Sequence, residues 1–140
     1  MNAPLYTTEI LRLAASLPEP SELVRVDGWA DERSPTCGST VRVQVQLDNG
    51  RVEAISQEVR ACAFGQASAA LLERSARGRA PEEIARALDE LTAWLAGESE
   101  DPGSWPGLVA LQPARSRRSR HGAILLPFKA LLTAAVSARG

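Results

Sequence analysis

Two cysteines and one histidine are the residues of this 140-residue chain whose chemistry best suits metal binding or sulfur transfer. Cys37 lies in a turn-forming run directly before an alternating strand pattern, and Cys62 follows the return strand. His121 precedes the last helical pattern of the chain. Thiolates and neutral imidazole are ligands for zinc and for the iron of iron–sulfur clusters. The question is whether the fold brings the three groups together.

The hairpin between the cysteines predicts that they lie close together. Residues 41–47 alternate strictly between valine or leucine and polar residues, which predicts a half-buried strand. Asn49-Gly50 is a strong signal for a two-residue hairpin turn. That register, continued outward, sets Cys37 opposite Cys62, and directly paired Cβ atoms lie about 4.5–5.5 Å apart. After Val52 the apolar residues change from even to odd positions, which predicts a β-bulge and leaves direct pairing open.

Each of the three residues also has a simpler interpretation. The cysteines could be small apolar side chains or a disulfide pair, since their separation matches no local zinc-finger spacing. Against this, Cys62 is expected at the start of a helix, where free N–H groups and the helix dipole favour a thiolate. Gly38 lets the backbone or a ligand approach Cys37. A lone histidine is usually a surface or capping residue, and sequence order does not show whether His121 reaches the hairpin.

The remaining pattern predicts an α+β fold in one domain over residues 1–140. A short amphipathic helix is expected near the N-terminus, and a loosely alternating strand over residues 22–30. Helices are expected from Ala61 to Gly78, from Pro81 onward, and over Ile124–Ala138. This order favours a small three-stranded antiparallel sheet with helices packed on one face. The three tryptophans are expected in the core or anchoring loops: Trp29, Trp94 and Trp105.

Composition excludes several classes of protein. Hydrophobic residues make up 44% and charged residues 24%, as in ordinary globular domains. The net charge of -1 gives no whole-molecule argument for nucleic acid or for an anionic membrane. We see no apolar run near the roughly 20 residues of a spanning helix, and no signal peptide. We therefore expect a cytoplasmic protein whose cysteines are free, metal-bound or reactive.

The segments around these residues resemble the IscU/NifU-type scaffold proteins of iron–sulfur cluster assembly, including the SufU branch. Residues 35–38, the hairpin and Cys62 are similar to the first two cysteine sites of that family in order and spacing. Residues 62–69 resemble its small-residue helix, and residues 121–125 resemble its His-Cys-Ser-Ile-Leu segment. The resemblance implies an IscU/SufE-like α+β fold in which three loops converge on one exposed metal site.

The resemblance also implies the ligands of that site. Cys37 and Cys62 stand at the first two cysteine positions and His121 at the histidine position. Gly122 replaces the third cysteine, and Ser39 replaces the aspartate. Three protein ligands would then hold a transient [2Fe–2S] cluster, iron or zinc. The fourth ligand would come from water, Ser39, another chain or a partner, so the implied site is open and exchangeable.

The segment before His121 departs from the family as well. An arginine-rich run, residues 114–120, stands where the family has its Leu-Pro-Pro-Val-Lys chaperone-recognition segment. Such a run is usually a solvated loop, which is the interpretation that we favour. Its alternative role is to dock an acidic face of a partner or, less readily, phosphates.

The function that the resemblance implies is that of a scaffold rather than an enzyme. It would accept sulfur from a cysteine desulfurase, bind iron or a transient [2Fe–2S] cluster, and pass it to recipient apo-proteins or cluster carriers. No nucleic-acid or membrane partner is expected. Two alternatives stay open: a zinc-associated sulfur acceptor of the SufU type, and a metal-free adaptor that binds the assembly machinery.

Overall fold

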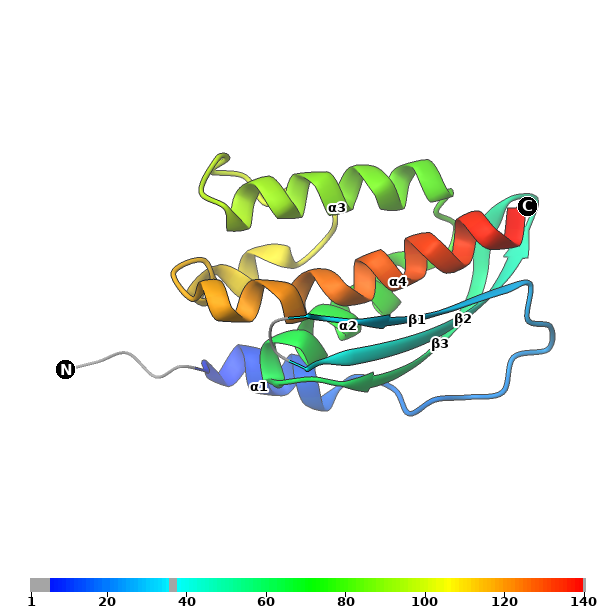
Figure 1. The fold of residues 1–140 in the computed structure, drawn as a ribbon, viewed down its shortest axis with the longest axis horizontal. Helices are drawn as coiled ribbons and strands as arrows, with labels where there is room; N and C mark the ends of the chain where they lie inside the picture. Colours follow the sequence, from blue (N-terminus) through cyan, green and yellow to red (C-terminus); the bar gives the residue numbers. More distant parts are fainter. Residues whose placement is uncertain (1–5, 36–37, 140) are drawn as a thin grey trace.

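A computed structural model describes residues 6–35 and 38–139 of the chain. The three strands form one antiparallel sheet in the order β1-β2-β3, with the helices on one side of it (Figure 1). The predicted α+β architecture is therefore confirmed. The elements are α1 (Thr8–Ala15), β1 (Gly28–Arg33), β2 (Thr40–Asp48), β3 (Arg51–Arg60), α2 (Ala63–Ala76), α3 (Pro81–Leu95), the 3₁₀ helices η1 (Leu108–Ala114) and η2 (Arg118–Arg120), and α4 (His121–Arg139).

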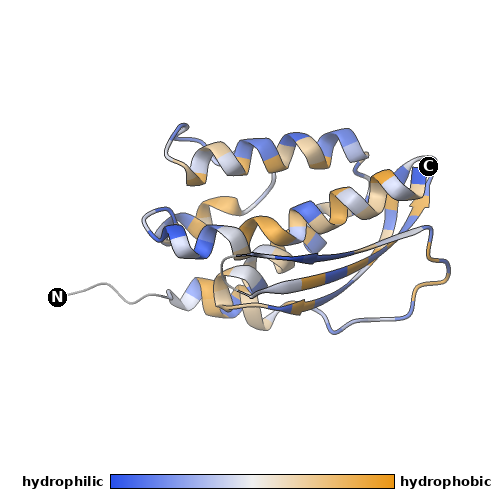
Figure 2. Cartoon of the chain, in the orientation of Figure 1, coloured by the Kyte–Doolittle hydropathy of each residue, from blue (hydrophilic) through white to orange (hydrophobic). Residues whose placement is uncertain are grey.

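The alternation in β2 separates a core face of the sheet from an outer face. Val41, Val43 and Val45 are buried against the helices, whereas Arg42 on the opposite face is exposed. Apolar residues of the helices and the sheet accordingly face one another across the interior (Figure 2). Period-two alternation produces this division because successive side chains of a strand point to opposite faces.

Helix α4 is the central helix of the core. It packs against β1, β2, α2 and α3, and it lies between α3 and the sheet (Figure 1). The contact with β1 is so close that a Cβ on Gly28 would lie 2.2 Å from the Ala134 carbonyl oxygen. The helical segment Arg118–Arg139 is long and apolar enough to cross a membrane, contrary to our expectation that no segment is. Half of its 18-residue apolar window is buried inside the protein, as in the core helix of a globular domain.

The structure corrects two expectations near the first strand. The strand expected over residues 22–30 begins only at Gly28, because the residues from Ser21 to Arg25 bond instead to side chains of β3 and β2. The Ser21 amide donates to Ser56 Oγ (2.9 Å), and the Arg25 amide donates to Gln46 Oε1 (3.3 Å). Trp29 was expected in the core or anchoring a loop, but it lies on the outer face and is 61% exposed.

The helices correspond closely to the predicted ones, with some shifts at their ends. Helix α3 begins at Pro81 as expected, and α2 covers Ala63–Ala76 of the predicted segment. Helix α4 begins at His121 rather than Ile124, so the histidine is part of the helix. The 3₁₀ helix η1 was not predicted. It packs against α2 and α1, with Leu108 and Leu111 buried.

Candidate functional site

The β2–β3 hairpin has the predicted turn and the predicted bulge. Asp48 pairs with Arg51 around Asn49-Gly50, and both turn residues have positive φ. The register then shifts between Gln46 and Leu47, so that the ladder ends with Thr40 opposite Arg60.

The shift affects the pairing expected for the two cysteines. Continued by two residues, the observed register would set Gly38, rather than Cys37, opposite Cys62. Cys37 lies outside the described residues, so its closeness to Cys62 stays a prediction. The loop that contains it starts and ends at the same end of the sheet as Cys62, because the Ser34 amide donates to the Ser39 carbonyl oxygen (2.9 Å).

Cys62 is the N-cap residue of α2 and carries a free, half-buried thiol. Its backbone is extended (φ -65°, ψ 173°), and its carbonyl oxygen accepts the Gln66 amide at 3.0 Å. Its side chain makes no capping hydrogen bond. The first amides of a helix have no partner within the helix and carry its positive dipole end. This position therefore suits a thiolate that binds a metal or receives sulfur.

The first turns of α2 and α4 touch each other directly. A Cβ on Gly65 would lie 3.2 Å from both Cβ and the carbonyl oxygen of Ala123. One turn farther along, Ser68 Oγ donates to the Ile124 carbonyl oxygen at 2.6 Å. Cys62 precedes this contact on α2, and His121 precedes it on α4. The two neighbouring helix starts thus carry the candidate thiol and the candidate imidazole to the same end of the molecule.

His121 is half-buried, and one of its ring nitrogens is already engaged. Nε2 lies 2.8 Å from the Ala114 carbonyl oxygen. A carbonyl oxygen only accepts hydrogen bonds, so Nε2 carries the proton and Nδ1 keeps its lone pair in the neutral ring. Metal-binding histidines in general donate their second ring N–H to such a carbonyl or to a carboxylate. The chemistry of His121 therefore fits a ligand that binds through Nδ1.

Two of the three predicted ligands belong to the described part of the chain. Within residues 6–35 and 38–139, no group of three or more His, Cys, Asp or Glu side chains is arranged to hold a metal ion. Ser39 is 6% exposed, so its side chain is buried in the protein. Gly122 lies in the first turn of α4 and offers no ligand atom. Cys62 and His121 are thus the two candidate ligands within the described residues, and the ligand role of Cys37 stays a prediction.

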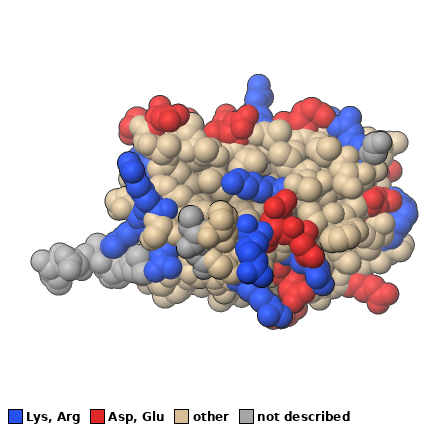
Figure 3. Space-filling view, in the orientation of Figure 1, with Lys and Arg blue, Asp and Glu red and all other residues tan. Residues whose placement is uncertain are grey.

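The arginine-rich run before His121 has two parts with different roles. Arg115 is not a solvated residue: Nε donates to the Trp94 carbonyl oxygen (2.9 Å), and Nη2 donates to that of Ser99 (3.0 Å). Its guanidinium also lies 5.2 Å from the ring centre of Trp94. Arg117 and Arg118 are exposed, as the loop interpretation predicts. Basic side chains gather at this end of the molecule (Figure 3).

A shallow groove of about 750 Å³ lies beside the same end of the sheet, and it was not predicted from the sequence. Its charges are partly paired, because Arg42 Nε donates to Asp31 Oδ1 at 2.7 Å. The charged residues on the outer face of the three strands were the only sign of this groove in the sequence. They become neighbours through the strand register, which the sequence pattern alone does not specify. The lining residues are Asp31, Glu32, Arg33, Gly38, Thr40, Val41, Arg42, Glu58 and Arg60.

Comparison of the sequence with family models and with curated proteins gives no match. Solved structures do match. The N-terminal part of a nitrogen-fixing NifU-like protein from Brucella abortus has a TM-score of 0.89 and 29% identity, covering 96% of this chain and 94% of that one.

Two further solved structures share the fold at lower identity. A putative iron–sulfur cluster assembly scaffold protein for the SUF system from Fervidobacterium islandicum AW-1 has a TM-score of 0.83 and 18% identity, over 94% of this chain and 96% of that one. A hypothetical protein has a TM-score of 0.68 and 20% identity, over 91% and 97%. The resemblance in the sequence thus extends to nearly the whole fold.

Proposed function

We propose, from the structural match to NifU-like and SufU scaffold proteins over nearly the full chain, that this protein is an iron–sulfur cluster assembly scaffold. It accepts sulfur from a cysteine desulfurase and binds iron or a transient [2Fe–2S] cluster. It then passes this cargo to recipient apo-proteins or cluster carriers. It works in the cytoplasm, as a scaffold rather than an enzyme, and without nucleic acid or membrane.

The observation that supports the proposal most directly is the contact between the first turns of α2 and α4, the two helices that start at Cys62 and His121. The contact between Gly65 and Ala123 holds the α2 and α4 ends together. A thiol at one end and an imidazole at the other are ligands that iron and zinc accept. Cys37, on the loop between Ser34 and Ser39, is the third proposed ligand.

Sulfur transfer to this site needs a nucleophilic thiolate. The thiolate of Cys62 attacks the outer sulfur of a desulfurase persulfide, and a new S–S bond forms on Cys62 as the old one breaks. The desulfurase cysteine leaves as a thiolate, so the step needs no external electrons.

The ligand set makes the site open. Two thiolates and one imidazole leave one position without a protein ligand, because Gly122 has no side chain where the resembling family has its third cysteine. Closed four-ligand sites are typical of structural zinc, whereas open sites exchange their fourth ligand. An open site suits cargo that is received and passed on. It is equally the feature that favours the alternative of a zinc-associated sulfur acceptor.

Anaerobic purification followed by iron, acid-labile sulfide and zinc analysis tests the proposal. Stoichiometric iron and sulfide, after reconstitution with iron and a sulfur donor, supports the scaffold. Zinc alone supports the sulfur acceptor of the SufU type. Neither metal supports the metal-free adaptor and overturns the proposal.

Single variants assign the ligands in the same experiment. We expect Cys37→Ser, Cys62→Ser and His121→Ala each to reduce the bound metal, because each removes one ligand. Lys129→Ala is the control, since Lys129 is exposed on α4 beyond its first turn. If Cys62→Ser and His121→Ala both bind as much metal as the control does, the site lies elsewhere.

A further inference from the structure

We propose that Arg115 is a positioning residue for the site: through the Ala114 carbonyl group it holds His121 in the tautomer whose Nδ1 is the ligand atom. The ligand role of His121 rests on the proposed function, whereas the tautomer and its dependence on Arg115 belong to the protein without metal. Nothing in the sequence pattern alone connects these two residues.

The first step of the argument is the carbonyl group of Ala114. Its oxygen has two lone pairs, and the structure fills both of them. The Arg117 amide donates to one at 2.9 Å, and His121 Nε2 lies 2.8 Å from the same oxygen. Neutral imidazole has one N–H, which this bond places on Nε2. Nδ1 is then the only ring nitrogen able to bind a metal.

The second step is what fixes that carbonyl in space. Ala114 is the last residue of η1 and is fully buried. The next residue, Arg115, donates to the carbonyl oxygens of Trp94 and Ser99 and stacks on the Trp94 ring. Trp94 is 1% exposed and belongs to the last turn of α3, where its carbonyl oxygen also accepts the Gly97 amide at 3.1 Å. Arg115 thereby ties the end of η1 to the core.

The third step is the chemistry that a guanidinium alone provides here. Two carbonyl oxygens and an aromatic face are bound at once by a planar group with five donors. A lysine at this position has one compact ammonium group and cannot reach all three. Glu100 Oε2 adds only a distant ion pair, 3.9 Å from Nη1. The effect of Arg115 is therefore directional and cannot be replaced by charge.

Imidazole nitrogen NMR of the metal-free protein tests the tautomer directly. His121 is the only histidine of the chain, so ¹⁵N-histidine labelling gives one pair of ring nitrogens. The spectra distinguish the two tautomers of the neutral ring, each of which carries one N–H. We expect Nε2 protonated in the wild type, and a mixture of both tautomers in Arg115→Ala and Arg115→Lys. Arg117→Ala is the matched control, because its side chain is exposed in the same loop, and it should resemble the wild type.

Zinc titration of the same proteins connects the tautomer to binding. Loss of a partner that orients a metal-binding histidine lowers metal affinity by roughly 10–100-fold, and we expect about the lower end for Arg115→Ala. Arg117→Ala should bind zinc as tightly as the wild type. Circular dichroism checks folding. Should Arg115→Ala not fold, Arg115→Lys carries the same expectation.

The outcomes separate this inference from the proposed function. A wild type protonated on Nδ1, or an Arg115→Lys variant that folds and keeps a pure Nε2 tautomer, overturns the inference. A wild type with the expected tautomer, lost in both Arg115 variants, but with no zinc, iron or cluster binding, supports the positioning role of Arg115. That result overturns the ligand role of His121 and the scaffold function with it.

Discussion

Gly122 stands between the candidate ligand His121 and the helix contact at Ala123. It lies in the first turn of α4 and is not among the glycines with positive φ. A glycine at this position is therefore not required by a left-handed backbone. Because glycine has no side chain, it offers no ligand atom at the position where the resembling family has its third cysteine.

Restoring that cysteine should strengthen the site. In Gly122→Cys, a thiolate beside His121 adds a fourth protein ligand, and thiolates are the usual ligands of iron–sulfur clusters. We expect a reconstituted cluster that survives dilution several times longer than in the wild type, at a similar melting temperature. Gly122→Ser is the matched control, because it adds a side chain of similar size without the thiolate. A normally folded Gly122→Cys protein whose cluster decays as fast as that of the control would remove Gly122 from the site.

At the level of single residues, the sequence showed which side chains could bind a metal or accept sulfur. It did not show which contacts position those side chains. Cys62 and His121 stand out by residue type and by their places before helical patterns. Arg115 does not, because its partners are the backbone carbonyl groups of Trp94 and Ser99, which only the tertiary structure brings near. The position of Trp29 was predicted wrongly for a related reason, because the strand register places it opposite Gln44 on the outer face of the sheet.

At the scale of elements, the site depends on how closely α2 approaches its surroundings. Gly65 is the residue that permits this approach. A Cβ at Gly65 would lie 2.6 Å from Ala61 Cβ, closer than real Cβ atoms approach, and 3.2 Å from Ala123 Cβ. The start of α2 therefore has to move if position 65 gains a side chain.

Gly65→Ala should destabilise the protein although alanine favours helices. Alanine gains up to about 1 kcal/mol of helix propensity over glycine, but overpacking a core costs typically about 1–3 kcal/mol. We expect a net loss of roughly 1–2 kcal/mol in urea unfolding. The double variant Ala61→Gly/Gly65→Ala should recover part of the loss, since it removes the nearer atom. An unchanged or higher stability of Gly65→Ala would show that the helix starts are not tightly packed.

The elements themselves were largely predictable because local chemistry agrees with the fold. Alternation in residues 41–47, the Asn49-Gly50 turn and Pro81 at a helix start each specify their element without help from distant residues. The strand expected over residues 22–30 began late because its first residues bond to side chains across the sheet. The 3₁₀ helix η1 was missed because its segment has neither the length nor the spacing of an α-helix.

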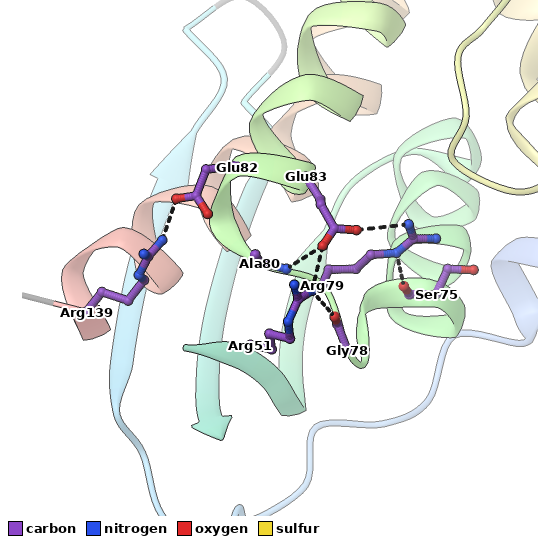
Figure 4. Close-up of polar contacts among 8 residues, drawn as sticks. All are labelled: Arg51, Ser75, Gly78, Arg79, Ala80, Glu82, Glu83 and Arg139. Carbon is purple, nitrogen blue, oxygen red and sulfur yellow. Dashed lines mark hydrogen bonds and ion pairs between the residues drawn. The ribbon is translucent and has the colours of Figure 1, made fainter. Parts of the chain in front are cut away.

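At the scale of the whole molecule, one network ties the far end of the sheet to the helices (Figure 4). Arg51 at the hairpin tip donates to Glu83 Oε1 (2.7 Å) and to the Gly78 carbonyl oxygen (2.9 Å). Glu83 also accepts the Ala80 amide at 3.2 Å, at the start of α3. Arg139, in the last turn of α4, pairs with Glu82 beside it. Strand, α3 and α4 thus meet through two carboxylates, opposite to the end that carries Cys62.

These carboxylates make the stability of the fold depend on pH. The pKa of Glu83 is lowered in the folded protein, first by the hydrogen bond from the Ala80 amide and then by that from Arg51. The folded pKa lies below the unfolded value of about 4.3, so the stabilisation is complete above pH 4.3 and is lost as the pH falls through the folded pKa. We expect Glu83→Gln to lower the melting temperature by a few degrees at pH 7, since its side chain is 41% exposed and solvent screens the pairs.

The pH series distinguishes this effect from a general loss of packing. As the pH falls below about 4, Glu83 of the wild type becomes protonated and loses the stabilisation that its carboxylate provides. Glu83→Gln lacks this carboxylate at every pH, so the melting temperatures of the two proteins should converge. Glu98→Gln is the control, because Glu98 is exposed in the loop after α3 and lies outside the network. A difference between wild type and Glu83→Gln that stays constant from pH 7 to about pH 3 would mean that the charge of Glu83 does not hold the sheet to α3.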